Sequence, residues 1–228
     1  MQITIGAWRI AIEQITPEPH ELGTIYDRVA TQWERSLDRL RYPQAYRSFF
    51  RELRRCGQFN GLPINAHVLD CGIGTGALSS AFLQQCASTV RLTGVDISSG
   101  MLQVARRTLT RPGISTVLYQ QDVCNLQFPD NTFDIVMGAH ILEHLPDPSI
   151  GLREMVRVLR PGAPLVIVVT RMSLFSLWLC LRWSLRRTDP SHMLTMMQAV
   201  GLKDVRVYRF MGLPWCNWMS IACVGTQS

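Results

Sequence analysis

Three glycines and two aspartates, each placed after an apolar stretch, have the types and spacing to hold a nucleoside-containing ligand. Gly72, Gly74 and Gly76 form a G-x-G-x-G run directly behind residues 66–71. Glycine adopts positive φ readily and lets a ligand approach the backbone closely. Asp96 follows 24 residues past Gly72, where a carboxylate can accept hydrogen bonds from both ribose hydroxyls. Asp122 ends the next apolar stretch, where it could accept from the exocyclic amine of adenine. Without these aspartates, the glycine run would be a weak signal, because a structural turn also explains it.

Two histidines behind a fourth apolar stretch are the candidates for moving a proton. His144, in "LEHLPDP", is the first choice and His140 the second. A neutral imidazole can accept a proton near pH 7, as a general base must. An equally good interpretation is that either histidine only packs or caps beside the short helix expected there.

The same stretch also supports a different class of enzyme. His140, Glu143 and His144 spell H-x-x-E-H, the signature of inverted zinc proteases. Pro146 would end the required helix almost at once. A zinc hydrolase also leaves the glycines and aspartates unexplained, so we expect no metal site.

The elements that must position these residues alternate along the chain. Apolar strand-like runs cover 66–72, 91–98, 116–122, 133–139 and 163–170, and helix-like segments cover 76–87, 99–109 and 147–162. Strands separated by helices predict βαβ units. The runs 204–210 and 219–227 are too close for a crossover helix and should pair antiparallel. We therefore expect an α/β, Rossmann-like, doubly wound sheet of seven mostly parallel strands, with an antiparallel last strand and helices on both faces.

Composition limits the partners and the compartment. Hydrophobic residues make up 47% and charged residues 18%, which is typical of a globular protein. The seven scattered cysteines form no C-x-x-C pair, which suits a reducing cytoplasm. Arg9 and Glu13 interrupt the apolar N-terminus, so a signal peptide is not expected. The net charge of +6 lies mostly in residues 28–55 and 182–228, which lack a nucleic-acid-binding motif. These basic flanks and the ten-residue apolar run 172–181 leave contact with a membrane surface open.

The chain resembles the class I S-adenosylmethionine-dependent methyltransferases, in their small-molecule, quinone-biosynthesis-like branch. The resemblance covers about residues 64–171 and rests on spaced motifs in the right order. These motifs are "VLDCGIGTG", "GVDISSGML", "QQDVCNLQFPDNTFDIVMGAHILEHLPDP" and "LREMVRVLRPGAPLVIVVT". The glycine run is one residue shorter than the G-x-G-x-x-G dinucleotide fingerprint, whose loop binds a diphosphate. S-Adenosylmethionine has a sulfonium amino acid in place of a diphosphate, which fits the shorter spacing. Cys71, Ile73 and Ala163 depart from the common family pattern without blocking the loop.

The resemblance implies roles residue by residue. Asp70 and the Gly72–Gly76 loop would face the amino acid portion of S-adenosylmethionine, and Asp96 would hold its ribose. The remaining predicted cofactor contacts are Ile97 and Met101 beside the adenine, Asp122 and Val123 at its edge, Ala139 near the methionine end, and Tyr26 as an aromatic lid. S-Adenosylhomocysteine would be the product.

The acceptor is less well defined by the sequence. Residues 138–141 read "GAHI" where methyltransferases that act on nucleobase amines have the [DN]-P-P-[YF] motif, so we expect a small molecule. The segment 172–200 is rich in Leu, Trp, Met and Phe, which favours a lipophilic or aromatic acceptor methylated at O, C or N. We expect one domain over 1–228, with a helical cap over 1–60, a cofactor-binding core over 64–171, a substrate-side helical insertion over 172–200 and a strand pair over 201–228. A non-catalytic binding protein with the same fold is the alternative.

Overall fold

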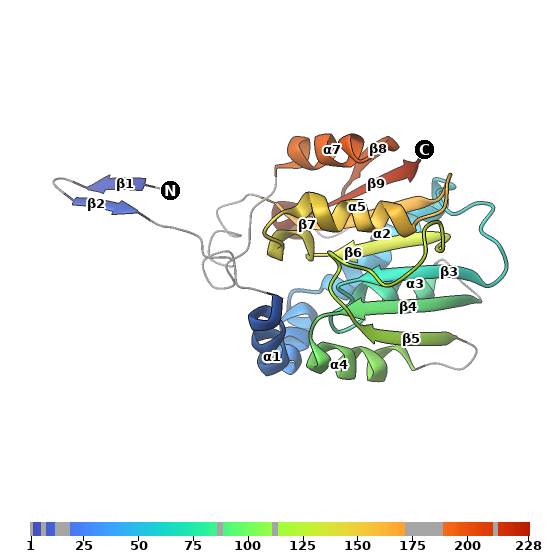
Figure 1. Ribbon diagram of the computed structural model, residues 1–228, viewed down its shortest axis with the longest axis horizontal. Coiled ribbons are helices and arrows are strands. Elements are labelled where there is room, and N and C mark those ends of the chain that lie inside the picture. The colour runs from blue at the N-terminus through green and yellow to red at the C-terminus, as the bar shows by residue number, and fades with distance from the viewer. Residues whose placement is uncertain are drawn as a thin grey trace.

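The protein is built around one seven-stranded sheet (Figure 1). The structure is a computed structural model and describes residues 2–5, 8–11, 19–85, 89–110, 114–171, 189–211 and 214–228. The strands of the sheet are β3 (Ala66–Cys71), β4 (Val90–Asp96), β5 (Ser115–Gln120), β6 (Ile135–Ala139), β7 (Pro164–Thr170), β8 (Leu202–Tyr208) and β9 (Ser220–Gln227). Their order is β5-β4-β3-β6-β7-β9-β8. Strands β3 to β7 pair in parallel, whereas β9 is antiparallel to both β7 and β8. The predicted fold class is confirmed.

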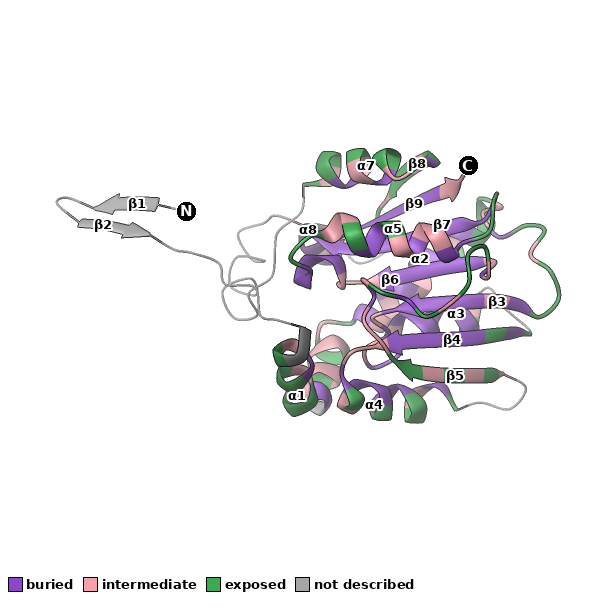
Figure 2. Cartoon of the chain, in the orientation of Figure 1, coloured by how far each residue is buried: buried purple, intermediate pink, exposed green. Residues whose placement is uncertain are grey.

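Helices cover both faces of the sheet, because successive strand residues point to opposite sides. Val68 packs with α2 (Tyr42–Arg55), α3 (Ala77–Gln85) and α4 (Ser99–Leu109) on one side. The next residue, Leu69, packs with α5 (Pro148–Val158) and α7 (Pro190–Ala199) on the other. Figure 2 shows the central strands buried between these layers. All seven residues of β7 are buried, which fits its near-continuous apolar sequence.

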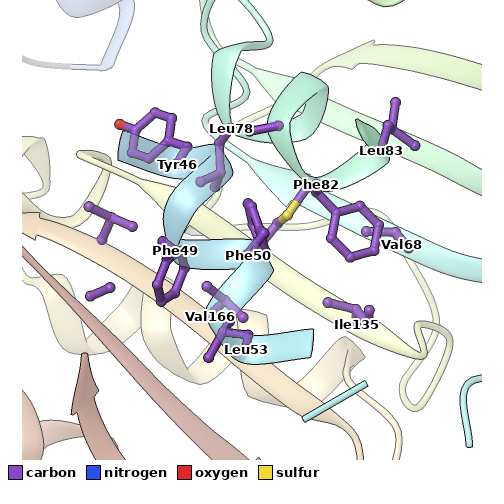
Figure 3. Packing of buried hydrophobic residues seen from close by; sticks show 14 of the residues in the cluster. Tyr46, Phe49, Phe50, Leu53, Val68, Leu78, Phe82, Leu83, Ile135 and Val166 are labelled. Atoms are coloured by element: carbon purple, nitrogen blue, oxygen red, sulfur yellow. The ribbon is translucent and has the colours of Figure 1, made fainter. Parts of the chain in front are cut away.

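Aromatic side chains join α2 and α3 to the sheet. Phe50 of α2 lies 5.4 Å from Phe82 of α3, measured between ring centroids, and both are fully buried. Figure 3 shows these rings in one cluster with Phe49, Leu53 and Val68. Burying a side chain of this size stabilises the fold by about 1.5–3 kcal/mol. The packing therefore holds α2 firmly beside the sheet and fixes Tyr46, one turn before Phe50, at the edge of the cluster.

The functional edge of the sheet is its carboxyl-terminal edge. Strand order reverses at β3, whose neighbours β4 and β6 lead away in opposite directions. In Figure 1 the arrows of β4, β5 and β6 point toward the side on which α1 (Pro19–Arg39) lies. Open α/β sheets bind ligands at such a switch point, outside the carboxyl ends of the strands.

Three helices begin with the capping chemistry that their sequences offer. The side chains of Ser98, Asp147 and Asp189 accept hydrogen bonds from backbone N–H groups in the first turns of α4, α5 and α7. Proline occupies the first turn of α5 and of α7, where its missing N–H is not needed. Each start is thereby fixed at the end of a connecting loop.

The strand pair expected over 201–228 is present as β8 and β9, whereas the N-terminal segment holds more than the expected helices. Within 1–60 the structure has α1 and α2, and also two short strands, β1 (Gln2–Ile5) and β2 (Trp8–Ala11), which pair antiparallel. The expected helical insertion over 172–200 lies mostly outside the described residues, which resume with α7. A short helix, α8 (Pro214–Met219), separates β8 from β9. Among the described residues, no helix has the length and apolarity needed to cross a bilayer.

Candidate functional site

The glycine loop after β3 uses backbone conformations that other residues adopt at a cost. Gly72, Gly74 and Gly76 have φ of 65°, 53° and 82°. A Cβ on Gly72 would lie 2.8 Å from the side chain of Ile141, whereas Gly74 is open. A Cβ on Gly76 would instead lie 3.0 Å from the side chain of Leu109 of α4, and Gly76 lines no part of the pocket described below. Gly76 thus lets the loop pack on α4, and its expected contact with the ligand stays a prediction.

Asp70, at the end of β3, is buried with half of its carboxylate unused. Its Oδ2 accepts a hydrogen bond from Ser79 Oγ at 2.5 Å. Its Oδ1 has no hydrogen-bond partner among the described residues. Burial raises the pKa of Asp70 from 3.8 to about 7, against the hydrogen bonds from Ser79 and with a further increase from the charge of Asp96. A cation donating to Oδ1 would favour the ionised form.

Asp96, at the end of β4, joins the glycine loop to α4. Its Oδ2 accepts from Gly74 N at 2.8 Å and its Oδ1 from Ser98 N at 2.9 Å. A carboxylate has about four acceptor positions, so each oxygen can still accept a ligand hydroxyl. Burial raises the pKa of Asp96 to about 6, against these backbone hydrogen bonds.

Asp27 of α1 fastens that helix to the start of α4. Its Oδ1 accepts from Ser98 Oγ at 2.6 Å and from Gly100 N at 2.7 Å, and these bonds lower its pKa. A Cβ on Gly100 would lie 3.0 Å from the Cα of Asp27, so glycine permits the close approach. Helix α1 is thus held across the pocket that Asp96 lines.

Asp122 and Val123 form the neighbouring end of the site, after β5. Asp122 Oδ1 accepts from Cys124 N at 2.8 Å, which fixes the loop. Asp122 and the buried Val123 line a pocket together with Asp96, Ile97 and other residues of the loops after β4 and β6. Asp122 and Val123 thus lie at one pocket with Asp96, and their predicted contact with adenine stays a prediction.

The two histidines follow β6 but have different partners. His140 Nδ1 lies 3.0 Å from Glu143 Oε1 and 3.1 Å from Thr170 Oγ1. His144 Nε2 lies 2.9 Å from the hydroxyl of Tyr26, which α1 brings over the pocket. Burial lowers the pKa of His144 to about 4, against the charge of Glu143. Burial also raises the pKa of Tyr26 far above 10.0, with contributions from Glu143 and Asp96. Both partners are therefore neutral at pH 7.

One continuous pocket brings nearly all of these side chains together. It encloses about 710 Å³, including the space open to solvent, and adjoins the pocket at Asp122. Of the predicted site residues it is lined by Tyr26, Asp70, Gly72, Gly74, Asp96, Ile97, Met101, Ala139, His140 and His144. Asp122 and Val123 line the adjoining pocket. Among the described lining residues none is Arg or Lys, so the carboxylates make the pocket suited to a cation.

Several lining residues were not predicted as part of the site. Leu22, Leu37 and Tyr46 come from α1 and α2, and Ile141 from the loop after β6. They belong to ordinary amphipathic or apolar patterns, which do not distinguish a ligand-facing side chain from a core side chain. Trp33 of α1 also lines the pocket and lies 6.1 Å from Tyr26 between ring centroids.

The geometry does not support the zinc interpretation of H-x-x-E-H. The segment Leu142–His144 is a single 3₁₀ turn rather than an α-helix. Nδ1 of His140 faces Glu143, and Nε2 of His144 faces Tyr26, so these two nitrogens do not converge on one point. In the part of the chain that the structure describes, no three His, Cys, Asp or Glu side chains gather as metal ligands.

The residues fit S-adenosylmethionine as the group that the fold implies. Asp70 Oδ1 is an unpartnered buried acceptor for an ammonium group, and Gly74 leaves open space above the loop. Asp96 keeps free acceptor positions for ribose hydroxyls, and the carboxylates favour a sulfonium charge.

Comparisons with known proteins agree with this fit. Residues 69–167 match the model of the methyltransferase domain family. The chain is 31% identical to the ubiquinone/menaquinone biosynthesis C-methyltransferase of Nitrosospira multiformis, over 67% of the chain and 61% of that protein. It is 37% identical to the demethylmenaquinone methyltransferase of Lactiplantibacillus plantarum, over 48% of the chain and 47% of that protein. The matches thus span about half to just under two thirds of the length of these relatives.

Solved structures show the same fold at lower sequence identity. An S-adenosylmethionine-dependent methyltransferase of Thermotoga maritima, described as a possible histamine N-methyltransferase, superposes with a TM-score of 0.67 at 18% identity. The superposition covers 91% of this chain and all of that one. The strand order, the pocket at the switch point and the matched motifs together show that the chain belongs to the class I S-adenosylmethionine-dependent methyltransferases and is a distant homologue of the quinone-biosynthesis enzymes.

Proposed function

We propose that this protein transfers a methyl group from S-adenosylmethionine to a small, lipophilic acceptor that carries an acidic hydroxyl. The observation that carries the proposal is the continuous pocket at the switch point, which joins the acidic strand ends to two histidines and a wall of aromatic and aliphatic side chains. A non-catalytic binding protein would need the first part of this pocket but not the second.

The chain's own residues divide the work of binding. Asp96 accepts from the ribose, Asp122 and Val123 meet the edge of the adenine, and Ile97 and Met101 pack against it. Asp70 pairs with the ammonium group, and Gly72 and Gly74 let the ligand approach the loop. When bound, S-adenosylmethionine supplies an electrophilic methyl group on a sulfonium sulfur.

The same pocket accounts for orientation and exclusion of water. Tyr26 and Trp33 of α1 close over the pocket, and Ala139 lines it after β6. Fixing the acceptor against the methyl group in a water-poor space can supply much of the rate enhancement. A general base is required where the acceptor must lose a proton.

The acceptor class follows from the lining and from the relatives. Leu37, Tyr46 and Leu78 offer apolar and aromatic surface to the acceptor. Two relatives are named for methylating demethylmenaquinone and for ubiquinone/menaquinone biosynthesis, so lipophilic hydroquinones are the first class to test.

Asp96→Asn tests the cofactor part of the proposal. Loss of a charged acceptor should weaken S-adenosylhomocysteine binding by about 1.5–3 kcal/mol, or about 10- to 150-fold. Isothermal titration of wild type and variant measures this, with Asp204→Asn, an exposed position on β8, as the matched control. Unchanged affinity in Asp96→Asn, or loss in both variants, would contradict the assigned ribose contact.

Turnover tests the acceptor part. Transfer of labelled methyl to demethylmenaquinol in detergent should be saturable. A wild-type protein that binds the cofactor but methylates no hydroquinone would remove this acceptor class, and one that binds no cofactor would favour the non-catalytic alternative.

A further inference from the structure

His140, which is partly buried, and the buried Glu143 form a pair at the carboxyl end of β6. His140 has φ of 57°, a left-handed conformation that is rare for a residue with a side chain. Such a conformation costs about 1–3 kcal/mol and persists only where the surroundings impose it. Its backbone N–H donates to Val168 O at 2.8 Å, which ties the turn to β7. The turn places the imidazole against the pocket.

Glu143 is held by β7 rather than by the turn alone. Its Oε1 accepts from Thr170 N at 2.7 Å, and its side chain is buried. Burial raises the pKa of Glu143. The hydrogen bond from His140 and the charges of His140 and His144 lower it by more, so the pKa lies below its ordinary value of 4.5. The carboxylate is therefore ionised at neutral pH and can only accept hydrogen bonds.

An ionised carboxylate beside Nδ1 decides the tautomer of His140. Nδ1 must carry the proton, because Glu143 Oε1, 3.0 Å away, has none to donate. Nε2 then bears the lone pair. This atom is buried and has no hydrogen-bond partner among the described residues, while the ring lines the pocket. Tyr42 packs edge-on against the ring, with centroids 5.6 Å apart, and so restrains its orientation.

His144, which the sequence favoured as the base, is less suited to the task. Its Nε2 already faces the hydroxyl of Tyr26 at 2.9 Å. Burial lowers its pKa to about 4, well below the range in which a general base works best near pH 7. The hydrogen bond between His144 and Tyr26 instead joins the turn after β6 to α1, which covers the pocket.

We propose that His140 Nε2 is the proton acceptor of the reaction and that Glu143 is the positioning residue that fixes His140 in the required tautomer. The inference rests on the proposed function, because it concerns an acceptor hydroxyl. The acceptor's O–H bond breaks, its electron pair stays on oxygen and the proton moves to Nε2. The imidazolium keeps its Nδ1–H on Glu143, whose negative charge stabilises it.

The tautomer can be measured without any acceptor. In protein labelled with ¹⁵N-histidine and saturated with S-adenosylhomocysteine, NMR should show His140 with Nδ1 protonated and Nε2 unprotonated. His140→Gln assigns the signals. His67, near the start of β3 and hydrogen-bonded to Thr93 of β4, is the internal control. Glu143→Gln can donate as well as accept, so it should populate the Nε2–H tautomer of His140 and leave His67 unchanged. An Nε2–H tautomer in wild type, or no change in the variant, would overturn the assignment.

Turnover then separates the positioning role from the proposed function. With demethylmenaquinol, Glu143→Gln should lower kcat about 100-fold, the scale of general-base catalysis, while S-adenosylhomocysteine affinity stays unchanged as proof of folding. The groups that face His140 are Glu143, His144, Tyr42 and Thr170, and of these only Glu143 carries a negative charge. Glu143→Gln removes that charge and destabilises the imidazolium, so the acid limb of its kcat profile should lie at lower pH than that of wild type. No turnover by wild type with any hydroquinone refutes the acceptor class and leaves the tautomer result standing. Wild-type kcat and pH profile in Glu143→Gln refute the positioning role.

Discussion

Replacing Asp70 by Asn should change how the stability of the protein depends on pH. Asp70 is 1% exposed, and burial raises its pKa from 3.8 to about 7. The difference corresponds to about 4 kcal/mol, at about 1.4 kcal/mol per pKa unit. Asn cannot ionise but can still accept the hydrogen bond from Ser79, so the substitution removes the charge and retains the shape.

The sign follows from the direction of the pKa change. Because the pKa is higher in the folded state, the folded protein binds the proton more tightly than the unfolded chain does. The stabilising contribution of Asp70 is complete below pH 3.8 and is lost as the pH rises through about 7. Relative to wild type, the free energy of unfolding of Asp70→Asn should therefore rise by up to about 4 kcal/mol between pH 4 and pH 8.

Urea unfolding at several pH values, followed by tryptophan fluorescence, measures this difference. Asp96 and His144 titrate in both proteins, so comparison of the two isolates Asp70. S-Adenosylmethionine affinity should change in the opposite direction to stability. The ammonium group pairs with ionised Asp70, so wild type should bind more tightly as the pH rises through about 7, whereas Asp70→Asn should not. A stability difference that stays flat from pH 4 to pH 8 would refute the claim that burial governs this carboxyl group.

Two further substitutions test the loop and the lid. Gly72→Ala should destabilise the protein by clearly more than the roughly 1–2 kcal/mol cost of a left-handed residue, because its Cβ meets a side chain at 2.8 Å. Gly162→Ala is its control in thermal unfolding, with φ of 77° and open space around the Cβ, and equal losses in the two would exclude a clash. Tyr26→Phe leaves His144 Nε2 buried without its partner and should cost about 1–3 kcal/mol in urea unfolding. Tyr119→Phe, on the exposed edge strand β5, should cost almost nothing, and the same result for Tyr26→Phe would contradict the contribution of that hydrogen bond.

The sheet and the positions of its acidic strand ends could be predicted from the sequence because both depend on local patterns. Alternating strands and helices imply a parallel sheet, and a parallel sheet brings Asp70, Asp96 and Asp122 to one edge. The strand order confirms that inference. The hairpin within 2–11 was not predicted, since its short apolar run carries no clear period.

Contacts between distant segments lay beyond such reasoning. Tyr26 and His144 are 118 residues apart, and nothing in either local sequence indicates their hydrogen bond. The left-handed backbone of His140 and the bond from Thr170 N to Glu143 likewise depend on tertiary packing. The motif H-x-x-E-H was visible, but its meaning depended on whether the turn was helical, and only the geometry decided that.

Burial of the whole of β7 gives the two walls of the pocket different mechanical properties. A central strand paired on both sides opens only when the entire sheet unfolds, whereas a surface helix can detach locally. Glu143 is bonded to the last residue of β7, while Tyr26 belongs to α1, which covers the sheet edge. Local opening of the pocket is therefore expected on the side of α1, whereas the side held by Glu143 and β7 opens only together with the sheet.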